Sequence, residues 1–221
     1  ADTYTAAGAN VAGFLDKAMP GHQLAQATPA SQVLLPAADP LFSNKLAANF
    51  TGAQRYASTL PASAWTFCHD GTGFENFTIF SRPVGTTGIQ TLLGTSDTLA
   101  TPGADITHFD MNAGRADFNI YNSGGTLFGL VGTPGLVAGD AALSQNASNE
   151  ITSYPRATNT INNAPPVIAS TYGVPAATAG AVPLTLGMIA SGSRQFTGKW
   201  LESLLFKRKL TAYERQIVRE Y

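Results

Sequence analysis

The chain has 221 residues, a formal net charge of −1 and only 12% charged residues. A chain of this length can bury a complete core as one sandwich domain, and so sparse a charge offers no field that would attract nucleic acid. The single cysteine, Cys68, excludes an intrachain disulfide and therefore a disulfide-stapled module. No apolar stretch approaches the roughly 20 residues of a membrane-spanning helix. We therefore expect neither a nucleic-acid partner nor a membrane span.

The first 45 residues differ in pattern from the remainder. Val11, Phe14, Leu15 and Ala18 recur at helical spacing, and Pro20 with Gly21 would end a helix there. The following residues, 23–40, are rich in Ala, Gln, Thr, Ser and Pro and show no sustained period. Residues 1–45 are therefore predicted to form a short helix and an extended arm, which packs along the main domain, residues 46–221, or along a neighbouring subunit.

Residues 46–221 read as an all-β domain. The 22 Gly and 13 Pro of the chain fall mostly between short apolar runs, as turns do between strands. Residues 140–166 are rich in Asn, Ser and Thr and contain three prolines, so we expect a long loop there.

Residues 107–122 carry the clearest local pattern, a polar and apolar alternation on both sides of Ala113 and Gly114. A hairpin in which Asp110 faces Asp117, His108 faces Asn119 and Asn112 faces Arg115 separates the polar from the apolar residues. Facing carboxylates repel each other, so Arg115, a protonated neighbour, a cation such as calcium or sugar hydroxyls must relieve them. The candidate binding residues are His108, Asp110, Asn112, Arg115, Asp117, Asn119 and Tyr121.

This polar face has two interpretations. It is either a solvated sheet surface whose charges Arg115 balances, or a shallow platform on which Tyr121 stacks against a glycan or a partner protein. No cofactor is expected, because the sequence contains no calcium-binding motif and His22, His69 and His108 lack the spacing of a zinc site.

The C-terminal residues predict a strand followed by a capped helix. Residues 200–206 alternate with apolar side chains on both faces, and we expect Glu202 to be a buried structural carboxylate. Thr211 and Glu214 have the spacing of a capping box, so a helix begins at Thr211. Its apolar stripe should be Tyr213, Ile217 and Tyr221, with Arg215, Gln216, Arg219 and Glu220 in solvent.

The C-terminal segment resembles the end of a concanavalin A-like domain, a superfamily that includes laminin G-like and pentraxin-like jelly rolls. The residues at matching places are Phe196, Gly198, Lys199, Trp200, Glu202, Leu204, Leu205, Phe206, Arg208, Leu210 and Thr211. Weaker matches lie at residues 49–52, 77–83 and 167–173. The resemblance implies a two-sheet antiparallel jelly-roll sandwich over residues 46–221, with a short C-terminal helix. It says little about function, because one fold hosts many functions.

Catalytic motifs are absent from the sequence. Glycosidases of this superfamily carry Glu-x-Asp-x-x-Glu on one strand, whereas no glutamate in this chain has a carboxylate two residues further on. Cys68 and His69 are neighbours, and on a strand neighbours point to opposite faces, so they cannot act as nucleophile and base. We expect Cys68 to be a buried, inert thiol beside a turn. We therefore expect a protein that is not an enzyme, and a polysaccharide hydrolase is the least favoured reading.

Two functional hypotheses follow. The first is a non-catalytic surface or structural module of a larger assembly, such as a bacteriophage virion protein that decorates the capsid or belongs to the tail. Its protein partners would bind the N-terminal arm and the C-terminal segment, where seven basic residues from Arg194 onward accompany three acidic ones. The alternative is a glycan-binding, lectin-like adhesion module. These hypotheses place the protein on the virion surface or outside the cell, respectively.

Overall fold

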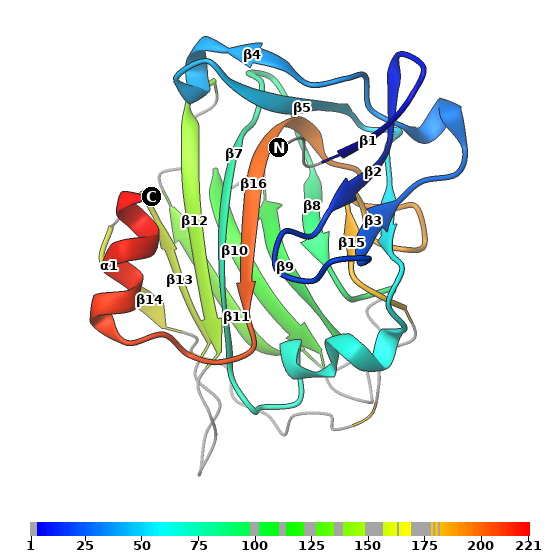
Figure 1. The fold of residues 1–221 in the computed structure, drawn as a ribbon. Coiled ribbons are helices and arrows are strands. Elements are labelled where there is room, and N and C mark those ends of the chain that lie inside the picture. The colour runs from blue at the N-terminus through cyan, green and yellow to red at the C-terminus, as the bar shows by residue number, and fades with distance from the viewer. Residues whose placement is uncertain are drawn as a thin grey trace.

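The computed structural model describes residues 4–97, 102–110, 114–121, 127–134, 139–148, 157–162, 164–168, 178, 180 and 182–221. The described strands form two antiparallel sheets that pack face to face as a jelly-roll-like sandwich, and a short helix follows the last strand (Figure 1). The predicted all-β sandwich with a C-terminal helix is confirmed. No helix within these ranges is long and apolar enough to cross a membrane.

The larger sheet contains nine of the described strands. Their spatial order is β1 (Tyr4–Ala7), β2 (Asn10–Leu15), β3 (Gln23–Ala25), β6 (Tyr56–Ser58), β15 (Thr185–Leu186), β8 (Ile89–Gly94), β9 (Gly103–Asp110), β10 (Arg115–Tyr121) and β11 (Leu127–Pro134).

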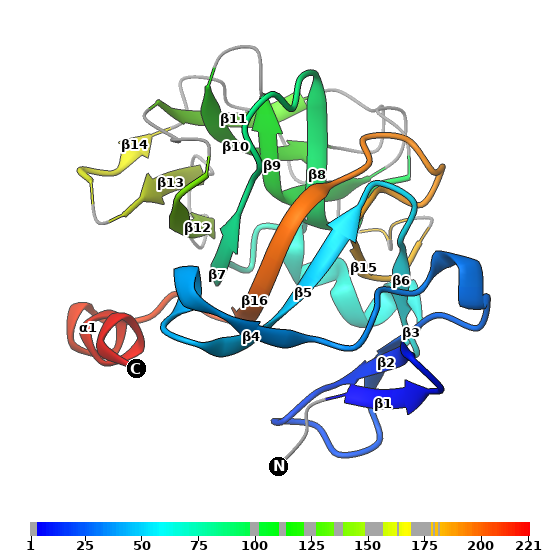
Figure 2. The ribbon, with the colours of Figure 1, turned by 90° about the horizontal axis from the view of Figure 1, so that it is seen from above.

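The smaller sheet contains seven of the described strands, and α1 (Ala212–Glu220) lies beside it (Figure 2). The strand order is β14 (Val167–Ile168), β13 (Ala157–Ile161), β12 (Ala141–Ser148), β7 (Phe74–Ser81), β16 (Thr197–Phe206), β5 (Lys45–Thr51) and β4 (Ala37–Asp39). Three short 3₁₀ helices span Pro29–Ser31, Pro40–Phe42 and Ala62–Cys68.

Aromatic side chains from both sheets fill the space between them. Phe80 of β7 lies 4.6 Å from Phe109 of β9 between ring centroids, and Phe74 lies 5.5 Å from Phe118 of β10 in an edge-to-face arrangement. These four side chains are fully buried. Because buried aromatic pairs add directional contacts to their apolar area, the core fixes how β9 and β10 lie over β7. It thereby positions the outward side chains of β9 and β10.

The predicted N-terminal helix is wrong, because β1, β2 and β3 extend the nine-stranded sheet. The pairing of β1 with β2 shifts between Thr5 and Ala6, and this bulge adds one residue to β2. Val11 and Phe14 are therefore both buried although they are three residues apart, a spacing that resembles a helix. No domain boundary falls near residue 45, because β3 pairs with β6 and Val11 belongs to the common core.

The long loop predicted for residues 140–166 is also wrong, because β12 and β13 lie within it. Ala142 and Ile161 of these strands belong to the core cluster, but other inward side chains are polar and bond to one another. Asn146 donates to the backbone oxygen of Ile106 at 2.7 Å, and Asn159 donates to Asn146 at 2.5 Å. A strand whose buried face is polar shows no apolar period, and this is why the sequence pattern did not reveal it.

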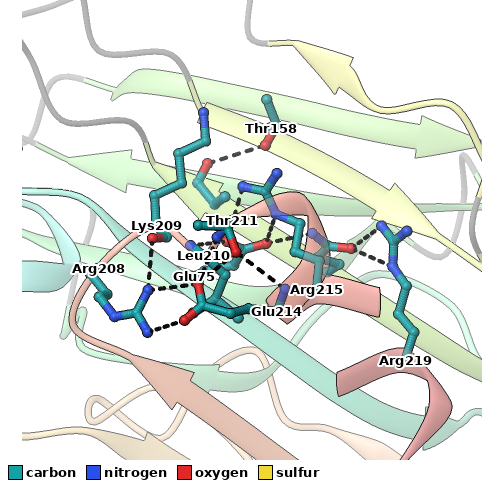
Figure 3. A network of polar contacts seen from close by, with 11 residues as sticks. Glu75, Thr158, Arg208, Lys209, Leu210, Thr211, Glu214, Arg215 and Arg219 are labelled. Atoms are coloured by element: carbon teal, nitrogen blue, oxygen red, sulfur yellow. Dashed lines mark hydrogen bonds and ion pairs between the residues drawn. The ribbon is translucent and has the colours of Figure 1, made fainter. Parts of the chain in front are cut away.

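At the C-terminus the capping box of Thr211 and Glu214 is confirmed, but the predicted orientation of α1 is wrong. Arg215 and Arg219 point toward the sheet (Figure 3), whereas the predicted apolar stripe is exposed. The buried carboxylate is Glu75 of β7, which Arg215 pairs, and not Glu202, which remains partly exposed beside Lys17. A charged group can be buried when a counter-ion and hydrogen bonds compensate it, so the ion pair decides which helix face meets the sheet.

Candidate functional site

The predicted polar residues of β9 and β10 share the face of the nine-stranded sheet that points away from the core. Phe109, Ala116, Phe118 and Ile120 belong to the core cluster, so their neighbours along each strand point outward. Asn112 lies outside the described residues. The outer polar face is defined as His108, Asp110, Arg115, Asp117, Asn119 and Tyr121, together with Thr91, Asp105 and Arg194, which contact them.

The predicted register of this hairpin is wrong by two residues. Asp110 faces Arg115, and His108 faces Asp117, so the two aspartates do not oppose each other. The observed pairing places Arg115 between opposite charges, with its Nε 2.8 Å from Asp117 and its Nη2 3.8 Å from Asp110. Opposite charges across strands stabilise a pair, and a shift of two residues preserves the face. The common face was therefore predicted correctly, although the partners were not.

Asp105 is a member of the face that sequence reasoning missed. The pairing of β9 with β10 shifts between Asp117 and Asn119, so β9 has one extra residue there and Asp105 lies on the same side as His108. Asp105 is fully buried and accepts a hydrogen bond from Tyr121 at 2.9 Å, while Arg194 and Ser96 also donate to it. Strict alternation would have assigned Asp105 to the core face.

The outer polar face is largely buried, contrary to the shallow platform that the sequence suggested. Asp117, Asn119 and Tyr121 have exposed fractions of 3%, 5% and 3%. The hydroxyl of Tyr121 is engaged by Asp105, so its ring does not serve as an open stacking surface. Arg115 and Asp110 remain accessible at the end of the hairpin, with side-chain exposures of 37% and 25%.

Burial changes the titration of two residues that face each other. It raises the pKa of Asp117 to about 6, although the neighbouring Arg115 acts in the opposite direction. It lowers the pKa of His108 to about 4, against the effect of Asp105. At neutral pH His108 is therefore uncharged, and its Nδ1 lies 2.9 Å from the hydroxyl of Thr91. The face combines a neutral imidazole, an ionised carboxylate and a guanidinium.

Three buried polar atoms on β10 lack an aligned hydrogen bond. Asn119 Oδ1 is buried without a hydrogen-bond partner, and Arg115 Nε and Asp117 Oδ1 form an ion pair without an aligned hydrogen bond. Most buried polar groups in folded proteins are hydrogen-bonded, so each exception requires an explanation. Because these atoms are buried and Arg115 Nε already faces Asp117 Oδ1 at 2.8 Å, the groups that can offer hydrogen bonds to a polyhydroxylated molecule such as a sugar are at the accessible end of the face, on Arg115 and Asp110.

The face does not resemble a metal site. Within the described ranges, no three His, Cys, Asp or Glu residues are placed to hold a metal ion. The facing pair of aspartates that suggested calcium is not formed, because Asp110 faces Arg115 and Asp117 faces His108. Arg115 instead balances the charge of both aspartates.

A hydrogen-bonded Asp, His and Ser relay lies elsewhere, between the β2–β3 turn and β6. His22 Nδ1 is 2.8 Å from Asp16 Oδ2, and His22 Nε2 is 3.0 Å from Ser58 Oγ. Leu60 N and Trp65 Nε1 donate to the same Ser58 oxygen at 3.0 and 3.2 Å. They fill both lone pairs of that oxygen, so Ser58 donates to His22 and no lone pair is available for attack on a carbonyl. The relay links the turn between β2 and β3 to β6 within the nine-stranded sheet.

Cys68 is a buried thiol, as predicted, although it lies on a 3₁₀ helix and not on a strand. Burial raises the pKa of this thiol well above its ordinary value, and Asp70 adds to the effect. A thiol that stays protonated is a poor nucleophile. His69 Nε2 lies 3.0 Å from the backbone oxygen of Thr178 and so joins two loops.

The sequence matches no protein-family model and no curated protein. Among solved structures, the fold is similar to the CBM40 of the Ruminococcus gnavus IT-sialidase bound to α2,3-sialyllactose, with 14% identity, a TM-score of 0.52, and coverage of 70% of this chain and 85% of that one. It is also similar to the NanB sialidase from Streptococcus pneumoniae, with 15% identity, a TM-score of 0.53 and coverage of 76% of this chain. The chain spans only 26% of that sialidase. At such identities the likeness shows a shared β-sandwich fold alone.

Proposed function

We propose that this chain is a non-catalytic, glycan-binding module whose ligand contacts the accessible end of the outer polar face, at Arg115 and Asp110. The observation that carries the proposal is the exposure of this pair of charged side chains, 37% and 25%, at the end of an otherwise buried polar face. The shared fold supports it, because one solved structure with that fold holds a sialylated sugar.

A sialylated glycan is the first ligand to test. Such a sugar carries a carboxylate and several hydroxyls. Arg115 would pair with the carboxylate, because guanidinium and carboxylate form strong charge-assisted hydrogen bonds, and Asp110 would accept from the hydroxyls. The hypothesis of a virion structural module stays a prediction, and so does a location on the virion surface.

Calorimetric titration of the purified protein with α2,3-sialyllactose and with lactose tests the proposal. We expect binding of the sialylated sugar, weaker or undetectable binding of lactose, and a loss of at least about tenfold in affinity for Arg115→Gln. Arg208→Gln is the matched control, since this exposed arginine lies in the turn between β16 and α1, outside the outer polar face. Equal affinity of Arg115→Gln and the unmodified protein would refute this site.

Absence of catalysis is tested in the same samples. We expect no release of free sialic acid on prolonged incubation, because sialidases use a tyrosine nucleophile. The tyrosine of the outer polar face, Tyr121, donates its hydroxyl to Asp105, and burial raises its pKa well above the ordinary value, so it stays protonated. Release of sialic acid that a single substitution in this chain abolishes would contradict the non-catalytic assignment.

A further inference from the structure

Arg115 contacts two carboxylates at the accessible end of the outer polar face, and they differ in burial. Its Nη2 lies 3.8 Å from Asp110, whose side chain is 25% exposed, and its Nε lies 2.8 Å from Asp117, whose side chain is 3% exposed. Arg115 Nε and Asp117 Oδ1 are both buried atoms. A ligand from solvent can therefore reach only the Nη nitrogens of Arg115, while Asp117 keeps the Nε side.

The surroundings of Asp117 make its negative charge costly. On β9 it faces His108, an uncharged imidazole at neutral pH, and on β11 it faces Gly132. Neither β11 nor β13, which also packs against β10, contains a titratable residue. The titratable and charged groups near Asp117 are His108, Asp110, Arg115 and, next to His108, the pair of Asp105 and Arg194. Burial raises the pKa of Asp117 to about 6, against the attraction of Arg115.

A ligand carboxylate bound to Arg115 would place a second negative charge beside Asp117. Two carboxylates on one guanidinium lie within the range of roughly 4–6 Å in which like charges disfavour ionisation. The bound ligand therefore favours the protonated form of Asp117, and by reciprocity the protonated form binds the ligand more tightly. A protonated carboxyl still offers an acceptor oxygen to Arg115 Nε, so the guanidinium keeps its orientation.

We propose that Asp117 couples the capture of an acidic glycan by Arg115 to the uptake of a proton, so that binding strengthens as the solution becomes mildly acidic. This inference rests on the proposed glycan site. Asp117 is mainly ionised at pH 7.5 and mainly protonated at pH 5, because its pKa is about 6. The ligand raises that pKa further, so affinity increases as the pH falls through this window. His108, with a pKa of about 4, stays largely uncharged over the same range.

Calorimetric titration of the full chain with α2,3-sialyllactose at pH 5, 6, 6.5 and 7.5 tests this inference. A ligand carboxylate of ordinary pKa, about 3.5, stays ionised at all four values. We expect at least about threefold higher affinity at pH 5 than at pH 7.5. Titrations at pH 6.5 in two buffers of different ionisation enthalpy should show uptake of about 0.3–0.6 proton per bound ligand. This buffer comparison does not require the protein to be stable at pH 5.

Asp117→Asn removes the titrating group. It should bind at pH 7.5 about as tightly as the unmodified protein binds at pH 5, with no proton uptake and little change with pH. Asp140→Asn is the matched control, because it removes an exposed carboxylate in the turn before β12 and should keep the pH profile of the unmodified protein.

The outcomes separate this inference from the proposed function. Binding that does not strengthen at lower pH, or a pH dependence that persists in Asp117→Asn, would overturn the proton coupling and leave the glycan site in place. No binding of sialyllactose at any of the four pH values would refute the glycan site itself, and the coupling with it.

Discussion

Arg115 lies between Asp110 and Asp117 and balances the charge at the accessible end of the outer polar face. The ion pair with Asp117 only partly offsets the cost of removing that carboxylate from water, because its pKa is still raised. A binding site often retains such a costly group, since a group optimised for stability would be fully satisfied within the fold.

Asp117→Asn should stabilise the protein at neutral pH by about 1–3 kcal/mol. The pKa of Asp117 is about 6 in the folded protein and about 4 in an unfolded chain. The folded state therefore holds the extra proton between pH 4 and 6, and the contribution of Asp117 to the free energy of unfolding falls as the pH rises through that window.

Urea denaturation of both proteins at pH 4, 5, 6 and 7 measures this difference. His108, whose pKa is lowered to about 4, contributes the opposite slope between pH 4 and 6.5 and is present in both proteins. The informative quantity is therefore the difference in the free energy of unfolding between the unmodified protein and Asp117→Asn. A difference that does not change with pH would contradict the raised pKa of Asp117.

Ser58→Ala should destabilise the protein by about 1–3 kcal/mol, because it removes the partner of Leu60 N, Trp65 Nε1 and His22 Nε2 at once. Urea denaturation followed by tryptophan fluorescence measures the change. Ser63→Ala, at an exposed position, is the control and should change stability by less than about 0.5 kcal/mol. Equal stability of the two variants would mean that the relay between the β2–β3 turn and β6 does not stabilise the folded protein.

At the scale of elements, α1 shows how a single buried carboxylate overrides an amphipathic pattern. The helix has a capping box, as its sequence predicts, so its existence is a local property. Its orientation follows from Glu75, which is more than a hundred residues earlier in the chain, on β7.

Arg215→Met should destabilise the protein by about 3–5 kcal/mol, because it leaves Glu75 buried without a counter-charge. Arg219→Met is the matched control and should cost less, since Arg219 is exposed and donates to an uncharged Gln145. Adding Glu75→Gln to Arg215→Met should restore part of the loss. Thermal melting of the three variants measures these differences, and a double variant no more stable than Arg215→Met would argue against the ion pair as the cause.

For the whole molecule, the main change from the sequence-based expectation is that residues 4–42 belong to the sandwich. β1, β2 and β3 continue the nine-stranded sheet beyond β6, and Val33 is buried in the same core as Val11. Backbone hydrogen bonds and core contacts within the chain compensate the entropy of ordering this segment.

Residues 4–42 should therefore resist protease in the monomer. Limited proteolysis followed by mass spectrometry should give no early cleavage in β1–β3 at protein concentrations where sedimentation shows a monomer. Deleting residues 1–27 should lower the melting temperature strongly, because it removes Val11 and Phe14 from the core. Early cleavage between β2 and β6 in the monomer would restore the hypothesis of an arm that requires a partner subunit.

The sequence by itself determined the all-β class, the capping box of α1, the buried Cys68 and the common face of the predicted hairpin residues, Asn112 apart. Each depends on local spacing along the chain, and the two-residue period of a strand keeps the same face even when the register shifts by two. Only the tertiary structure decided the partners of Arg115, the place of Asp105, the strand at residues 10–15 and the orientation of α1. A bulge shifts the alternation of inward and outward side chains by one residue, and an ion pair between residues far apart in the chain outweighs the apolar stripe of α1. Neither effect produces a pattern that can be read from neighbouring residues in the sequence.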